Sequence, residues 1–131
     1  MSDYNFMDLI NLLLYDTDKF IHAIKSDFSL LNKKYAGNES LISFVATEGY
    51  VDALVLLANL GSDINYQDNL METPLHEAIL SKNIDCVRAL LSLGANTKLK
   101  NLAGLNALEW AQFLEVDREI IDMIFKYDKS S

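Results

Sequence analysis

The segment ETPLHEAI, residues 72–79, combines the residue types in this chain that could most readily do chemistry. His76 is followed by Glu77, and a histidine beside a carboxylate can act as a general acid or base. Catalysis would also need a positioned partner and a pocket, so a small hydrolytic enzyme that uses His76 is the lesser alternative. In the same segment Thr73 precedes Pro74, a pair typical of a helix N-terminus, which favours a structural role for the histidine.

Other residues with chemical potential are isolated along the chain. His22 has no cysteine or histidine near it, so we expect a surface residue and no metal site. Cys86 lies beside the apolar stripe of a predicted helix, which indicates a buried structural thiol. Phosphate-binding glycine loops and nucleophile elbows are absent from the sequence. We therefore expect no cofactor and no enzyme activity.

Composition indicates one globular domain over residues 1–131, because half of the residues are hydrophobic and 23% are charged. A single cysteine suits a reducing compartment. The N-terminal segment MSDYNFMDLI is acidic where a signal peptide would be basic, and the longest apolar run, ALVLLANL, is too short to span a bilayer. We expect a soluble, cytoplasmic protein that is monomeric on its own.

The net charge of −8 comes from 19 carboxylates against 11 Lys and Arg residues. Such a surface repels the phosphates of nucleic acids and anionic membranes, and it attracts basic proteins. We therefore expect a basic protein partner, with no binding to nucleic acid or membrane.

A repeat with a period of 33 residues runs through the chain, because Ser40, Thr73 and Asn106 lie 33 residues apart and a further step back reaches Met7. LGSDIN, which begins at residue 60, aligns with LGANTK, which begins at residue 93. The period predicts four units at residues 2–34, 35–67, 68–100 and 101–131.

Each unit is expected to contain two short helices. In the third unit, Thr73 is the predicted N-cap and Pro74 the first helical residue. The second helix ends at Gly94, which can adopt a left-handed C-terminal cap. Because so short a helix pair cannot bury its apolar faces alone, we expect neighbouring units to stack and complete the core.

Three features together resemble an ankyrin repeat: TPLHEA at residues 73–78, LLSLGAN at residues 90–96, and Asp68 five residues before the threonine. The resemblance implies an all-α ankyrin-repeat solenoid of four stacked helix-loop-helix units, with the terminal units acting as caps. It also implies that His76 ties the helix start and the adjacent turns together through hydrogen bonds.

The chain departs from the ankyrin pattern at two glycine positions. Met71 stands where Gly104 keeps the family's glycine, and Lys82 stands where Gly49 keeps another. A residue with a side chain is uncommon at a left-handed position and carries strain.

The resemblance also implies a partner-binding concave face, formed by the tips of the hairpin turns and the exposed side of each first helix. Mapping the repeat columns predicts an apolar and acidic surface of this kind, which is typical of a protein interface. Its residues are Tyr15, Glu39, Phe44, Glu48, Leu70, Glu72, Glu77, Leu80, Leu102, Leu105, Trp110, Phe113 and Leu114.

Two alternatives concern the apolar members of this surface. Trp110, Phe113 and Leu114 could be buried in a terminal cap, and Leu70 and Leu102 could pack against each other between hairpins.

The sequence therefore predicts non-catalytic protein recognition. The main interpretation is an inhibitor that blocks a basic partner, in the way that an immunity protein blocks a toxin or effector. The alternative is an adaptor or scaffold that bridges two partner proteins.

Overall fold

The computed structural model describes residues 4–36 and 39–130, which form eight α-helices and one 3-10 helix. The unit boundaries predicted at residues 2 and 131 lie outside the described residues. The first helices of the successive units are α1 (Phe6–Tyr15), α3 (Leu41–Glu48), α5 (Pro74–Leu80) and α7 (Ala107–Phe113). The second helices are α2 (Thr17–Ser26), α4 (Val51–Leu60), α6 (Ile84–Ser92) and α8 (Arg118–Ser130), and the 3-10 helix η1 (Phe28–Leu30) follows α2.

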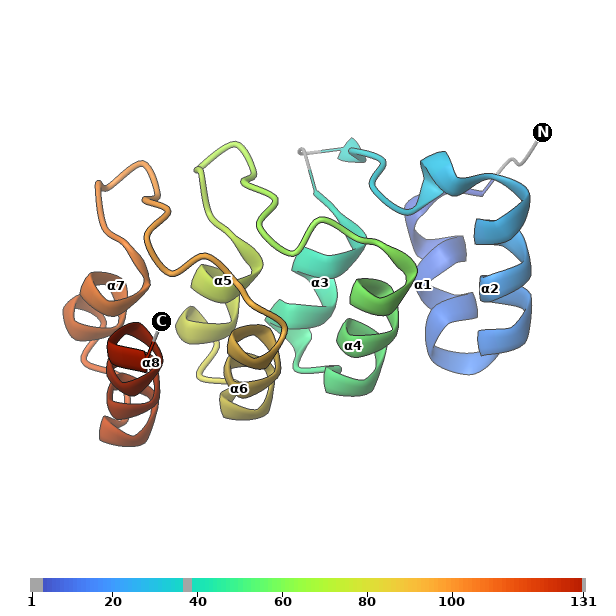
Figure 1. Ribbon diagram of the computed structural model, residues 1–131. Helices are drawn as coiled ribbons and strands as arrows, with labels where there is room; N and C mark the ends of the chain where they lie inside the picture. The colour runs from blue at the N-terminus through green and yellow to red at the C-terminus, as the bar shows by residue number, and fades with distance from the viewer. Residues whose placement is uncertain (1–3, 37–38, 131) are drawn as a thin grey trace.

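The helix pairs stand side by side in a row, and the turns that precede the first helices project from one edge of the row (Figure 1). First helices pack on first helices, with α3 against α5 and α5 against α7. Second helices do the same, with α4 against α6 and α6 against α8. The predicted all-α stack of helix-loop-helix units is confirmed.

The first helices begin at the columns that the repeat predicts. Ser40, Thr73 and Asn106 are the N-caps of α3, α5 and α7, and each side chain accepts a hydrogen bond from the backbone N–H three residues later. Such a cap satisfies one of the amide groups that a helix start leaves without a partner. Pro74 occupies the first turn of α5, as predicted.

The first helix of the first unit starts earlier than the period predicts. The 33-residue interval points to Met7, but Asn5 is the N-cap of α1. Asn5 accepts from the Asp8 N–H at 2.8 Å, and the Asp8 carboxylate accepts from the Asn5 N–H at 3.0 Å. This reciprocal pair fixes the helix start, so α1 is longer at its N-terminus than the other first helices.

Three projecting turns are closed by the same backbone hydrogen bond. The N–H of Asp68 donates to the Glu72 carbonyl at 3.1 Å, and Tyr35 with Glu39 and Asn101 with Leu105 repeat this bond 33 residues earlier and later. We call these three turns the hairpins.

Left-handed residues occupy the predicted positions. Met71 and Lys82 both have φ 59°, beside Gly104 at 79° and Gly49 at 84° in the equivalent columns. Gly94 follows α6 with φ 90°, as predicted. The two non-glycine residues therefore carry the expected backbone strain, which costs about 1–2 kcal/mol each.

The core runs the length of the stack between the two rows of helices. Side chains from every unit are fully buried there, including Phe20, Leu41, Leu57, Leu75, Ile79, Leu90 and Ile120. Each such side chain contributes about 1.5–3 kcal/mol when it is removed from water. Because neighbouring units supply parts of one continuous core, no unit is stable without another.

A close contact between units makes Gly49 more sensitive to substitution than Gly94. A Cβ added at Gly49 would lie 3.0 Å from Oδ1 of Asn83 in the next unit, whereas a Cβ at Gly94 would have nothing within 4 Å. The Asn83 amide donates to the carbonyls of Ala46 at 3.1 Å and Thr47 at 2.8 Å, at the end of α3.

We predict that Gly49→Ala lowers the free energy of unfolding by about 1 kcal/mol more than Gly94→Ala, because both substitutions strain a left-handed residue but only the first disturbs the Asn83 hydrogen bonds. Urea denaturation of both variants measures the difference. Equal losses would show that the Asn83 contact does not couple the two units.

Candidate functional site

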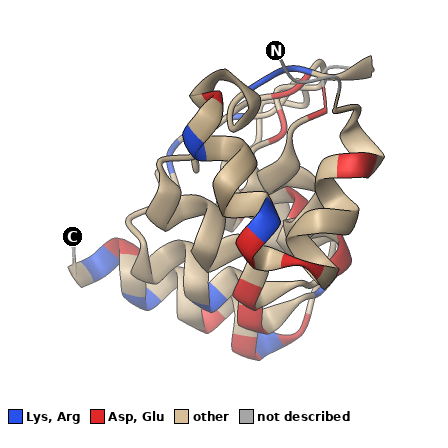
Figure 2. Ribbon diagram, turned by 90° about the vertical axis from the view of Figure 1, so that its right-hand side faces the viewer, with Lys and Arg blue, Asp and Glu red and all other residues tan. Residues whose placement is uncertain are grey.

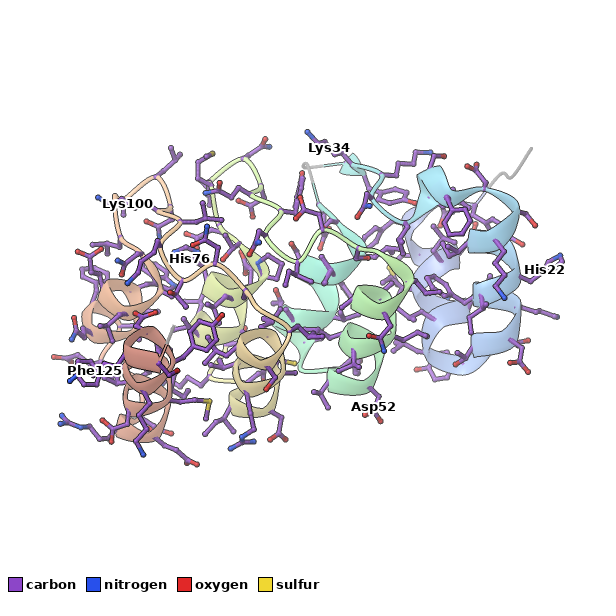
Figure 3. All side chains as sticks on the ribbon, viewed as in Figure 1. His22, Lys34, Asp52, His76, Lys100 and Phe125 are labelled. Carbon is purple, nitrogen blue, oxygen red and sulfur yellow. The ribbon has the colours of Figure 1, made fainter. Side chains whose placement is uncertain are left out.

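His76 is a structural residue at the junction of the third and fourth units (Figure 3). Its side chain is 1% exposed. Nδ1 accepts a hydrogen bond from the Thr73 N–H at 3.2 Å, which leaves the proton on Nε2, and Nε2–H donates to the Leu105 carbonyl at 3.0 Å. Burial lowers the pKa of this imidazole below its ordinary value. Both ring nitrogens are therefore engaged by the protein, and the predicted tie between the helix start and the next hairpin is confirmed.

Further hydrogen bonds join the third and fourth hairpin units. The Leu102 N–H donates to the Leu70 carbonyl at 2.9 Å, and Gln67 Nε2 donates to the Lys100 carbonyl at 3.0 Å. The indole N–H of Trp110 donates to the His76 carbonyl at 3.2 Å. These bonds hold the two hairpins and the two first helices in a fixed relation.

The other residues with chemical potential also have structural environments. Cys86 is fully buried, and burial raises the pKa of its thiol to about 11, so the thiolate that would react is disfavoured. His22 is exposed. A cavity of about 470 Å³ lies between the first two units, with Leu13, Tyr50 and Leu56 in its wall, and His76 does not line it. Residues 4–36 and 39–130 contain no cluster of three His, Cys, Asp or Glu that could hold a metal ion.

The predicted surface residues divide into two groups by exposure. The exposed members are Tyr15, Glu48, Leu70, Leu80, Leu102 and Phe113. The half-buried members are Glu39, Phe44, Glu72, Glu77, Leu105, Trp110 and Leu114. Together they line the hairpins and the first helices, and we call this face the hairpin–helix surface.

The apolar members in the third and fourth units lie on this surface and are not core. Leu70 and Leu102 are 60% and 68% exposed, so their backbones pair while their side chains do not bury each other. Phe113 is 69% exposed and stacks on Trp110, with ring centroids 5.9 Å apart. The alternative of a buried cap is wrong for Phe113, whereas Trp110 and Leu114 are half-buried and pack against the core.

Two predicted aromatic residues do not join this group. Phe44 packs on the core and meets the edge of Phe6 at a centroid distance of 5.5 Å. Tyr15 is exposed at the end of α1, in the first unit. The aromatic part of the surface is therefore concentrated in the fourth unit.

Carboxylates gather where the hairpins meet the first helices. Glu72 accepts from Asn101 Nδ2 at 3.1 Å, and Glu77 accepts from the Thr47 hydroxyl at 3.3 Å. Burial, followed by the negative charges of Glu77 and Asp68, raises the pKa of Glu72 to about 7. Burial, followed by the charges of Asp68 and Glu39, raises the pKa of Glu77.

These carboxylates lack internal counter-charges. Within the described residues, no Lys or Arg forms an ion pair with Glu39, Asp68, Glu72 or Glu77. Figure 2 shows acidic segments gathered on the right-hand side of the view, opposite the C-terminus, and basic segments spread singly over the ribbon. The free protein therefore holds negative charge at this surface at a cost to its own stability.

Sequence reasoning missed three residues of this surface. Asp68 orders its hairpin by accepting from the Leu70 and Glu72 N–H groups, both at 2.9 Å, and it adds charge to the carboxylates. Thr47 is the hydroxyl partner of Glu77. Met71 presents a partly exposed side chain from its strained position. The departure of Met71 from the glycine column was the available signal for the last.

Comparison with known protein families agrees with this geometry. The sequence matches the family described as ankyrin repeats (3 copies) over residues 2–101 and again over residues 40–129. The chain belongs to the ankyrin-repeat family. Ankyrin repeats bind other proteins, so this chain is a protein–protein interaction module of a generally non-catalytic class.

Several curated ankyrin relatives are similar to this chain. An ankyrin and IPT/TIG repeat-containing protein of Schizosaccharomyces pombe is 35% identical over 101 residues, 77% of this chain and 8% of the relative. The BRCA1-associated RING domain protein 1 of Caenorhabditis elegans is 36% identical over 94 residues, 70% of this chain and 13% of the relative. The nuclear factor NF-kappa-B p105 subunit of Gallus gallus is 36% identical over 73 residues, 56% of this chain and 7% of the relative. The chain thus matches only a small share of each relative's length.

No helix in the described part of this ankyrin stack is long and apolar enough to cross a membrane.

We predict that Glu72→Gln stabilises the ankyrin stack at high pH. A glutamate whose pKa rises from 4.5 to about 7 on folding contributes stability below pH 4.5 and loses that contribution as the pH rises through 7. Glutamine keeps the acceptor for Asn101 and carries no charge. The variant should exceed the original protein by about 1 kcal/mol at pH 8, since solvent screens a half-exposed carboxylate, and by little at pH 4.5.

Chemical denaturation at both pH values measures this change, with Glu48→Gln at an exposed position as the control. A stability difference that is the same at pH 4.5 and pH 8 would contradict the assignment of unfavourable charge to Glu72.

Proposed function

We propose that this ankyrin-repeat chain is an inhibitor that binds one basic protein across its hairpin–helix surface and blocks that protein's own site. The observation that carries the proposal is the presence of half-buried, unpaired carboxylates beside exposed apolar side chains on one rigid face. Apolar anchors bordered by charge are typical of protein interfaces.

A basic partner follows from the charges of the surface. The cationic side chains of such a partner would neutralise Glu72 and Glu77, which crowd each other and Asp68 in the free chain. The net charge of −8 would speed its encounter with this ankyrin stack. A toxin or effector with a basic active-site cleft, paired with an immunity-type inhibitor, would meet these conditions.

Inhibition by occlusion fits the size of the surface. A standard interface covers about 800 Å² of each partner, which would occupy much of one face of a stack of this size. We also propose a cytoplasmic location, because the single cysteine, Cys86, is a buried free thiol that suits a reducing compartment.

An adaptor is the alternative, and an exposed residue on the opposite row of helices favours it. Phe125 on α8 is 48% exposed, and Lys129 lies over its ring at 5.3 Å. A second partner could contact α8 while the first occupies the hairpin–helix surface.

Capture of partners from the native host by the tagged chain, at low and at physiological salt, tests this proposal. Mass spectrometry identifies the bound proteins and light scattering gives their stoichiometry. We expect one basic protein in an equimolar complex whose association slows as salt rises. Two different proteins bound at once would favour the adaptor, and an acidic partner would contradict the proposal.

Charge reversal then locates the surface. We predict that the triple variant Glu39→Lys, Glu48→Lys and Glu72→Lys weakens binding to the captured partner by about 10- to 100-fold. The control triple variant, Asp85→Lys, Glu119→Lys and Asp122→Lys, makes the same change in charge on the second helices. Equal losses in the two variants would mean that only net charge matters, and unchanged affinity in the first would remove the hairpin–helix surface from the interface.

A further inference from the structure

Two apolar patches flank the carboxylates in the third and fourth units. The first, which we call the tip patch, consists of Leu70, Met71 and Leu102 on neighbouring hairpins. The second, which we call the shelf, consists of Leu80 on α5 with Trp110 and Phe113 on α7. Along the chain, Glu72 and Glu77 fall between Met71 and Leu80, so negative charge separates the two apolar patches.

Met71 indicates that the tip patch has a role beyond folding. Its φ of 59° places a long apolar side chain in the left-handed region, and that side chain is 40% exposed. The equivalent position in the next hairpin is Gly104, which adopts φ 79° without strain from a Cβ. Strain kept at an exposed side chain points to a use for that side chain.

The shelf is held in place by its neighbours. The Trp110 N–H is bonded to the His76 carbonyl, and the ring of Phe113 lies at 11° to the Trp110 ring. Leu80 stands 33 residues before Phe113, on the adjacent packed helix. The aromatic rings therefore present a preformed apolar area that needs little ordering on binding.

The carboxylates between the patches are oriented but uncompensated. Asn101 and Thr47 each supply one neutral hydrogen bond to Glu72 and Glu77, respectively. No Lys or Arg of the described chain pairs with either carboxylate. A cation from outside would meet two carboxylates in a partly desolvated setting, where such a pair is stronger than on an open surface.

We propose that the occupant of this surface is a protein segment in which a Lys or Arg is flanked on both sides by apolar side chains. One apolar side chain packs on the tip patch, the cation lies between Glu72 and Glu77, and the other apolar side chain packs on the shelf. This inference rests on the proposed function, because it names the part of the basic partner that the hairpin–helix surface holds. The same charges disfavour a nucleic acid or a second copy of this acidic chain.

Random dodecapeptides displayed on phage, selected against the full chain, provide the probe. We expect enriched sequences to carry a Lys or Arg with an aromatic or aliphatic residue on each side. A synthetic peptide of the enriched sequence, labelled with fluorescein, then gives a dissociation constant by fluorescence anisotropy for each variant of the chain.

Three substitutions test the three contacts, each against a matched control elsewhere. Phe113→Ser is paired with Phe125→Ser on α8, which is also an exposed phenylalanine. Met71→Gly is paired with Lys82→Gly, which relieves the same φ of 59° away from the hairpins. Glu77→Gln is paired with Glu119→Gln on α8.

We expect each test substitution to weaken peptide binding at least fivefold and each control to leave it within twofold. Met71→Gly should weaken binding without lowering the melting temperature, because glycine removes strain at this position. That combination separates a binding role from a folding role.

Several outcomes would overturn the inference. Enriched peptides without a basic residue, peptides that bind equally well to Phe113→Ser and Met71→Gly, or no enrichment after repeated rounds would each contradict it. The proposed function would survive these results if the captured basic protein still depended on Glu39, Glu48 and Glu72. It would fail separately if that protein were insensitive to those charges.

Discussion

The structure depends on one constraint, which is that a pair of helices this short cannot bury its own apolar faces. Each unit must therefore lend its faces to its neighbours, and Leu75 and Ile79 of α5 belong to a core shared along the stack. Polar contacts between units fix the spacing that this shared core requires. His76 is the clearest example, since its imidazole joins its own helix start to the carbonyl of Leu105 in the next unit.

Stacking also leaves the hairpin–helix surface free of folding duties. The core and the junctions between units supply the stability, so this face can hold groups that an isolated small domain would avoid. Glu72 and Glu77 remain close together without a cation, and Met71 keeps a left-handed backbone. Such costs are expected where a surface is used for binding, because residues suited to a partner need not suit the free protein.

The period of the chain carried most of the fold. Thr73 and Pro74 could be placed at a helix start because their chemistry there is local, and the left-handed position of Met71 followed from column alignment. The start of α1 was misplaced because the unit is longer than its period, although Asn5 with Asp8 three residues later is a readable capping signal.

The surface was harder to predict than the fold, because exposure depends on how neighbouring hairpins and helices lie in space. The exposure of Phe113 and the crowding of Glu72 by Asp68 are contacts between segments that no periodicity reports.

The central claim is that the stack holds carboxylates unpaired between two apolar patches, in a state that a basic partner relieves. Carbon-13 NMR of the glutamate side-chain carboxyls, recorded from pH 3 to pH 9 on the free chain, tests it most directly. The account predicts that Glu72 titrates with a pKa of about 7, well above an ordinary glutamate. A Glu72 pKa near 4.5 would mean that water already relieves its charge, and would contradict the account.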